Sequence, residues 1–126
     1  LLIDGGEWRD AVSRAYYAVL DAADGALAAI RITPKSHAGT LTLFSARLIQ
    51  PGRVPRRYGR MINQIQKWRI EADYNRMEAV AEGRAREALA DAEDFEAMVE
   101  ALLPDLLNTD EADPGDSGDF AHPDPA

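Results

Sequence analysis

Residues 66–75, Gln-Lys-Trp-Arg-Ile-Glu-Ala-Asp-Tyr-Asn, decide how this chain folds and where its polar groups gather. At the period of an α-helix, Trp68 and Ala72 share one face. The neighbouring face carries three polar residues, Arg69, Asp73 and Tyr74. The segment therefore predicts a helix that turns an apolar stripe toward a core and holds an ionic and phenolic cluster beside it.

The composition limits the class of protein. The chain has 126 residues, of which 46% are hydrophobic and 29% charged, and this is enough for one domain with a real core. It has no cysteine, which excludes disulfides and thiolate chemistry. We expect no metal and no cofactor, because the motifs that bind them are absent. With no apolar run of membrane length and no leader, we expect no membrane association and a cytoplasmic location.

Apolar residues recur at spacings of three and four in four segments, which predicts helices over residues 7–30, 36–49, 56–74 and 78–107. We therefore predict an all-α fold, an antiparallel bundle of four to five helices, within residues 1–107. Residues 1–6 look like the end of a helix and a turn, so we expect the first helix of the bundle to be truncated. Residues 108–126 are acidic, rich in Pro and Gly and aperiodic, and are predicted to be a disordered tail.

Charge is unevenly distributed along the chain. The net charge is −8, yet the stretch from Arg31 to Arg69 contains nine basic residues and no Asp or Glu. Within it, Arg56, Arg60 and Lys67 are spaced so that they form one ridge on a helix. A solvated face would explain the ridge, but like charges on one helix face repel each other. We predict that the ridge guides phosphates. The acidic tail is interpreted as a solubilising segment, and shielding of the ridge by this tail is the alternative.

Three further polar residues are candidates for a site. Arg14 and Tyr17 lie three residues apart on the first predicted helix and project together, either as part of a solvated face or toward a ligand. Ser36 is a plausible N-cap of the second helix, which places His37 in its first turn. A histidine there serves capping or packing, or takes part in a site.

Three segments in order resemble one family: residues 11–18 (Ala-Val-Ser-Arg-Ala-Tyr-Tyr-Ala), 34–39 (Pro-Lys-Ser-His-Ala-Gly) and 69–74 (Arg-Ile-Glu-Ala-Asp-Tyr). Together with the Phe44 helix and the Pro51-Gly52 turn, they resemble the small stand-alone HEPN proteins of bacteria and archaea over residues 1–107. The resemblance implies an antiparallel helical bundle, a homodimer, and a partner nucleotidyltransferase in a toxin–antitoxin or defence pair. It also implies a ligand, RNA or a nucleotide. The binding residues are then expected to be Arg14, Tyr17, His37, Arg69, Asp73 and Tyr74.

The resemblance has one departure, which bears on catalysis. Family members that are metal-independent RNases carry Arg followed after four to six residues by His, whereas here Tyr74 stands where that His is expected. A phenol with a pKa near 10 is a poor base at neutral pH. The first hypothesis is therefore a binding protein without the usual RNase motif. The alternatives are an RNase with a non-standard Arg-x4-Tyr site, and a non-catalytic module that docks a nucleotidyltransferase.

Overall fold

A computed structural model of the chain describes residues 5–74 and 82–112, and the side chains of residues 8–72 and 82–108. The regular elements in these residues are all helical, as predicted. Their bounds are α1 Gly5–Ala29, α2 His37–Phe44, the π-helical segment η1 Ser45–Ile49, α3 Arg57–Tyr74 and α4 Glu82–Ala112.

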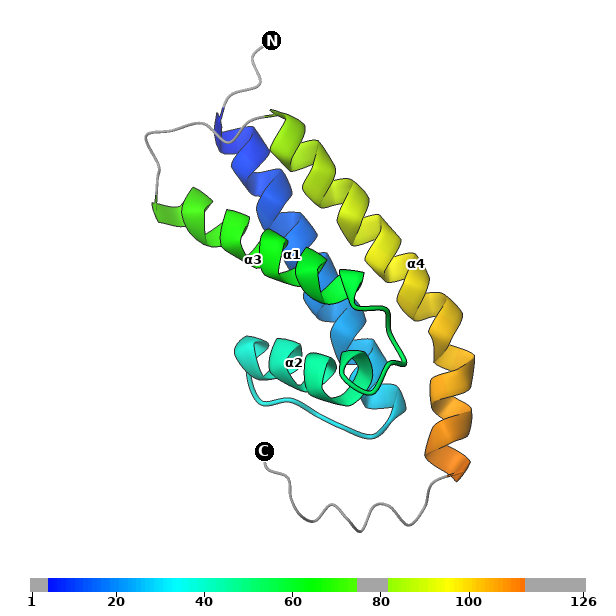
Figure 1. The fold of residues 1–126 in the computed structure, drawn as a ribbon. Helices are drawn as coiled ribbons and strands as arrows, with labels where there is room; N and C mark the ends of the chain where they lie inside the picture. Colours follow the sequence, from blue (N-terminus) through cyan, green and yellow to red (C-terminus); the bar gives the residue numbers. More distant parts are fainter. Residues whose placement is uncertain (1–4, 75–81, 113–126) are drawn as a thin grey trace.

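Helix α1 is the centre of the bundle (Figure 1). Helix α4 packs along α1 and runs in the same direction, α3 returns in the opposite direction, and α2 lies beside the end of α1. Because three helices contact α1, its apolar residues must cover more than one narrow stripe. The buried residues of α1 are Ala11, Val12, Ala15, Tyr16, Val19, Leu20, Ala23, Ala26, Leu27 and Ala29.

The contact between α1 and α4 depends on small side chains. Ala85, Ala88 and Ala92 are buried on the first half of α4, and alanines recur on the buried surface of α1. Small residues let two helix backbones approach closely. Further along α4, Phe95 is fully buried, with its ring centroid 5.3 Å from that of Phe44 on α2. This aromatic contact joins the second predicted helix to the core that the other helices share.

The helix ends differ from the predicted ones in two places. The second helix changes from α-helical to π-helical geometry at Ser45, so the predicted helix 36–49 consists of α2 and η1. Helix α4 continues through Pro104 to Ala112, so residues 108–112, predicted to belong to the tail, are helical. Its last turns change direction (Figure 1), as a proline that removes one helical hydrogen bond produces.

An ionic network fixes the beginning of α3 on α4. Arg57 Nη1 donates to Asp94 Oδ2 at 3.0 Å, and the Tyr58 hydroxyl donates to Asp94 Oδ1 at 2.8 Å. The hydrogen bond from Arg57, with a further one from Tyr58, lowers the pKa of Asp94. One turn earlier on α4, burial raises the pKa of Asp91, and the nearby charges of Glu87 and Asp94 add to that shift.

These opposite shifts predict opposite effects of two neighbouring substitutions. A lowered carboxyl pKa stabilises the fold above the ordinary carboxyl range, and this stabilisation is lost as the pH falls through the folded-state pKa. Asp94→Asn should therefore lower the melting temperature at pH 7 and weaken its fall between pH 5 and 3. Asp91→Asn should leave the melting temperature at pH 7 unchanged or raise it, because the raised pKa means that ionised Asp91 costs stability. Thermal unfolding followed by circular dichroism checks both variants, and equal decreases would contradict the assignment.

Candidate functional site

Arg69 of α3 lies over two neighbouring tyrosines of α1. Its Cζ is 4.7 Å from the centroid of the Tyr16 ring and 5.7 Å from that of Tyr17. Its Nη2 also donates to the Tyr17 hydroxyl at 3.4 Å. A guanidinium at these distances is attracted to the negative faces of the rings. The half-buried cation is therefore held in place by α1.

The two tyrosines have different surroundings although they are adjacent in the sequence. Successive residues of a helix point about 100° apart, so Tyr16 turns into the core and is 6% exposed, whereas Tyr17 is 39% exposed. Their rings meet edge to face at a centroid distance of 5.1 Å. Arg69 thus bridges a buried ring, which anchors it, and an exposed ring, which a ligand can reach.

His37 of α2 also contacts the ring of Tyr17. The two rings meet edge to face with their centroids 5.6 Å apart. Ser36 caps α2 as predicted, because its Oγ accepts from the backbone nitrogen of Gly39 at 3.0 Å. The Thr40 hydroxyl donates to Asp24 Oδ1 of α1 at 2.8 Å, which fastens the first turn of α2 to α1. We call Tyr16, Tyr17, His37 and Arg69 the Arg69 cluster.

The other residues predicted for this site have different positions. Arg14 is exposed on α1, one turn before Tyr17, as the spacing predicts. The backbones of Asp73 and Tyr74 form the end of α3, but their side chains lie outside the described residues. Within the described residues, no group of three or more His, Cys, Asp or Glu is placed to hold a metal ion. No described helix is both long and apolar enough to cross a membrane.

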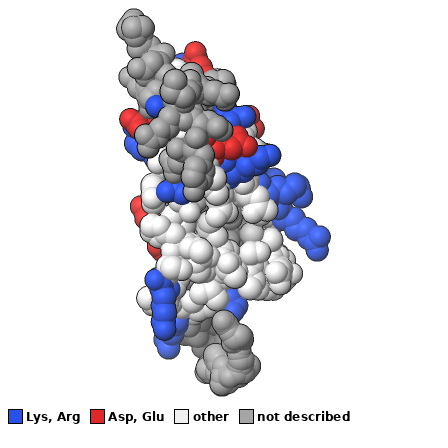
Figure 2. Space-filling model, turned by 90° about the vertical axis from the view of Figure 1, so that its left-hand side faces the viewer, with Lys and Arg blue, Asp and Glu red and all other residues white. Residues whose placement is uncertain are grey.

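The basic ridge lies on another side of α3. Arg56, Arg60 and Lys67 are all exposed, so the predicted ridge faces solvent. Lys67 and Arg69 are two residues apart and therefore point about 160° away from each other around the helix axis. The side of the molecule where α2 and the end of α3 lie shows a broad uncharged area with Lys and Arg at its edges (Figure 2). The ridge and the Arg69 cluster are thus two separate features of α3.

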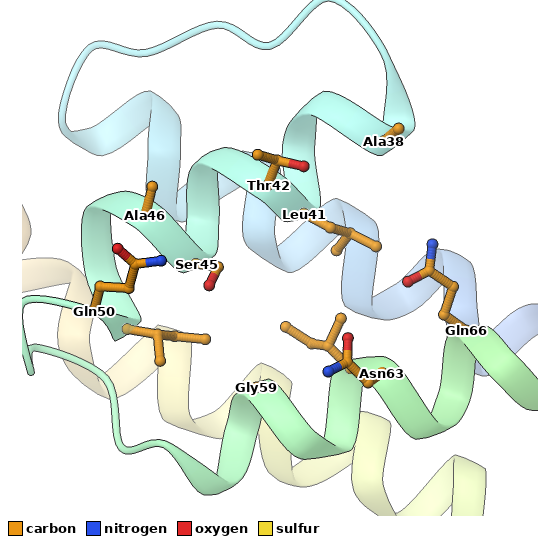
Figure 3. Close-up of a pocket in the computed structure, with 11 residues that line it drawn as sticks. Ala38, Leu41, Thr42, Ser45, Ala46, Gln50, Gly59, Asn63 and Gln66 are labelled. Carbon is orange, nitrogen blue, oxygen red and sulfur yellow. The ribbon is translucent and has the colours of Figure 1, made fainter. Parts of the chain in front are cut away.

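A groove separates α2 and η1 from α3, on the same side of α3 as the ridge. Leu41 and Ser45 lie on one wall, and Gly59 and Asn63 on the other (Figure 3). Its volume is about 420 Å³, and none of its lining residues is charged or aromatic. We call it the α2–α3 groove. A second hollow adjoins it, shares Ile49, Gln50, Gly59 and Asn63 with it, and adds Arg56 and Arg60.

Two features of the site were missed from the sequence. The Arg69 guanidinium lies closer to the ring of Tyr16 than to that of Tyr17, but Tyr16 was not among the predicted site residues. The sequence feature that indicates Tyr16 is its position next to Tyr17, since two adjacent tyrosines on a helix point their rings to two different faces. The α2–α3 groove was also missed. Its signal was Gly59, a glycine in the first turn of α3, where alanine would be the better helix former.

Comparisons with known proteins give a family and several relatives. The description of the matching family is HEPN domain, and the match covers residues 1–102. The chain is 32% identical over 107 residues to the protein of Methanocaldococcus jannaschii named "Putative toxin MJ0605", covering 85% of this chain and 79% of that protein. It is 27% identical over 106 residues to a UPF0332 protein of Thermotoga maritima, with 84% and 80% covered.

A third relative matches a shorter part of the chain. A UPF0332 protein of Gloeobacter violaceus is 36% identical over 74 residues, which is 59% of each chain. No solved structure matches the chain significantly. The relatives therefore come from archaea and bacteria, and two of the matches extend over most of both chains.

The geometry predicts how much Arg69 contributes to stability. Arg69→Gln removes the guanidinium from the rings of Tyr16 and Tyr17 and should lower the free energy of unfolding by about 1–2 kcal/mol. Arg14→Gln removes an exposed arginine of the same polar surface and should change it by less than about 0.5 kcal/mol. Urea denaturation of the two variants measures the difference. Equal losses would show that the contact with the tyrosines does not hold Arg69.

Proposed function

This chain belongs to the HEPN domain family, and we propose that it is a toxin-like member that binds RNA or a nucleotide through the Arg69 cluster. The observation that carries the proposal is the position of Arg69, whose half-buried guanidinium lies over one buried and one exposed tyrosine ring. A fixed cation beside an exposed ring suits a ligand that contains both a phosphate and a base.

Each group of the cluster has a chemical task in this proposal. The guanidinium presents several N–H donors in a planar fork, which matches the oxygens of a phosphate. The exposed face of Tyr17 offers a surface on which an unstacked base packs. His37 lies beside Tyr17 and supplies a hydrogen-bonding ring at the edge of the same site. Arg14, Asp73 and Tyr74 remain proposed members of the site.

Cleavage of RNA is the alternative for the same site. Attack of the 2′-hydroxyl on the adjacent phosphate requires a base to take its proton and an acid to give one to the leaving 5′-oxygen. Arg69 would hold the phosphate, and His37 is the imidazole that the structure places in the cluster. A His37 with this role would compensate for Tyr74 at the position where family RNases carry His.

The partners follow from the family and from the name of one relative. We propose a homodimer that acts in a toxin–antitoxin or related defence pair with a nucleotidyltransferase. The name of the Methanocaldococcus jannaschii relative supports the toxin-like part of this proposal. A module that only docks the nucleotidyltransferase is the competing interpretation, and the uncharged walls of the α2–α3 groove favour it as a protein-binding surface.

Binding of single-stranded RNA tests the function. Tyr17→Ala should weaken binding about 5- to 150-fold, because stacking on an aromatic ring contributes about 1–3 kcal/mol per base. Tyr17→Phe keeps the ring and should bind within about twofold of the wild type, since it removes only a weak hydrogen bond. Fluorescence anisotropy with a labelled RNA oligonucleotide in EDTA measures both variants. Equal affinities of Tyr17→Ala and the wild type would refute binding at this cluster.

The same samples separate the alternatives. Cleavage without metal that is abolished in both His37→Gln and Arg69→Lys would establish the RNase interpretation. If the wild type neither binds nor cleaves RNA but purifies with a nucleotidyltransferase, the docking interpretation holds.

The role of the basic ridge is tested by salt. If Arg60 and Lys67 bind phosphates, Arg60→Gln/Lys67→Gln should reduce the slope of log K against log salt by roughly 0.7 for each phosphate that is no longer neutralised. Arg86→Gln is the matched control, because Arg86 is an exposed arginine of α4 that pairs with Glu82. Titrations between 50 and 200 mM salt give the slopes. A slope that the double variant leaves unchanged would contradict an electrostatic role of the ridge.

A further inference from the structure

We propose that the α2–α3 groove binds the chain's own C-terminal segment, with Phe120 in the groove and Asp116 and Asp119 against Arg56 and Arg60. The inference does not depend on the Arg69 cluster or on its ligand. It assigns an occupant to a surface that the family membership does not explain.

The groove is built to receive an apolar side chain. Leu41, Ile49 and Ile62 form its apolar floor, while Ala38, Ala46 and Gly59 leave space between the helices. Its volume of about 420 Å³ is in the range of pockets that enclose small ligands. Gly59 keeps this space open, because a Cβ at this position would reach 3.5 Å from Ile49 Cδ1.

The charges around the groove select an acidic occupant. Arg56 and Arg60 line the adjoining hollow, and no acidic residue occurs in the sequence between Arg31 and Arg69. The last 14 residues of the sequence, 113–126, contain four aspartates and no lysine or arginine. The surface and the segment are therefore complementary in charge, and attraction between them lowers the repulsion within the ridge.

The segment also contains the required apolar group. Phe120 is the only Phe, Tyr or Trp after Phe95, and Asp116 and Asp119 precede it closely. Phe120 comes eight positions after Ala112, the end of α4, and an extended chain of eight residues spans up to about 26–29 Å. This reach equals two to three helix spacings of about 8–10 Å. The last turns of α4 lie at the same end of the bundle as α2 (Figure 1).

A nucleic acid fits this groove less well than the acidic segment does. Bases bind by stacking on aromatic side chains, and the groove has none. An acidic segment with one phenylalanine instead uses the uncharged cavity and the neighbouring arginines together. Occupation by the segment would also place aspartates on the ridge, so the segment would compete with any polyanion that the ridge attracts.

A spin label tests the contact directly in the full chain. The sequence contains no cysteine, so Ser117→Cys provides a single attachment site next to Phe120. In the 15N-labelled protein, the label should broaden the amide signals of Ser45, Gly59 and Asn63 at low salt, and Phe120→Ser should restore them. Signals of these amides that remain as sharp as those of the outer face of α4 would overturn the proposal.

Two glycine substitutions provide the matched control. Gly59→Leu fills the groove and should abolish the broadening, whereas Gly25→Leu makes the same exchange in α1, where a Cβ meets nothing within 4 Å, and should leave it intact. Circular dichroism checks that both variants fold. Broadening that Gly59→Leu does not reduce would also overturn the proposal. A mixture of spin-labelled protein without 15N and 15N-labelled protein without the spin label reports contacts between molecules. Equal broadening in this mixture would show that the segment binds another copy, and would overturn binding within one chain.

Discussion

The close packing of α1 against three other helices is the constraint on which the rest of the structure depends. A helix packed in this way must be apolar on more than one side, and its partners can approach closely only where side chains are small. Alanines at 11, 15, 23, 26 and 29 meet this need on α1, as do Ala85, Ala88 and Ala92 on α4. A larger residue at these positions would force the helices apart, because protein interiors have few voids to accept it.

The Arg69 cluster follows from this packing. Ten of the α1 residues in the described range 8–29 are buried against the other helices, and Tyr17 is one of the exposed positions on its polar edge. Helix α3 crosses α1 at this edge and places Arg69 over both tyrosines. The aromatic rings and the Tyr17 hydroxyl offset part of the cost of desolvating the guanidinium. The cluster is therefore positioned by the core, although its exposed ring faces solvent.

The sequence predicted the helices well because their apolar periods are long and regular. It also predicted Ser36 as a cap, since the side chain and the backbone amide that it binds are only three residues apart. Contacts between distant segments were harder. The pairing of Arg69 with Tyr16 spans 53 residues, and the pairing of Arg57 and Tyr58 with Asp94 depends on how α3 crosses α4. Periodicity gives the face of one helix, but not the part of another helix that meets this face.

The two basic features of α3, Arg69 and the ridge, lie on different faces of the helix. Arg69 points toward α1, whereas Arg60 and Lys67 point away from it, and only a helix that is covered on one side makes this distinction. The inner face holds one arginine in a fixed orientation against aromatic rings. The outer face presents hydrated charges at the border of an uncharged groove, and such charges attract anions over a distance without fixing them.

A phosphate-containing ligand bound at Arg69 would therefore not contact the ridge through the same group. It would have to extend around α3, past Gln66, which lines the groove and lies one turn before Arg69. A polymer meets this condition and a single nucleotide does not, so the separation of the two faces favours RNA over a mononucleotide wherever both the ridge and the cluster take part in binding.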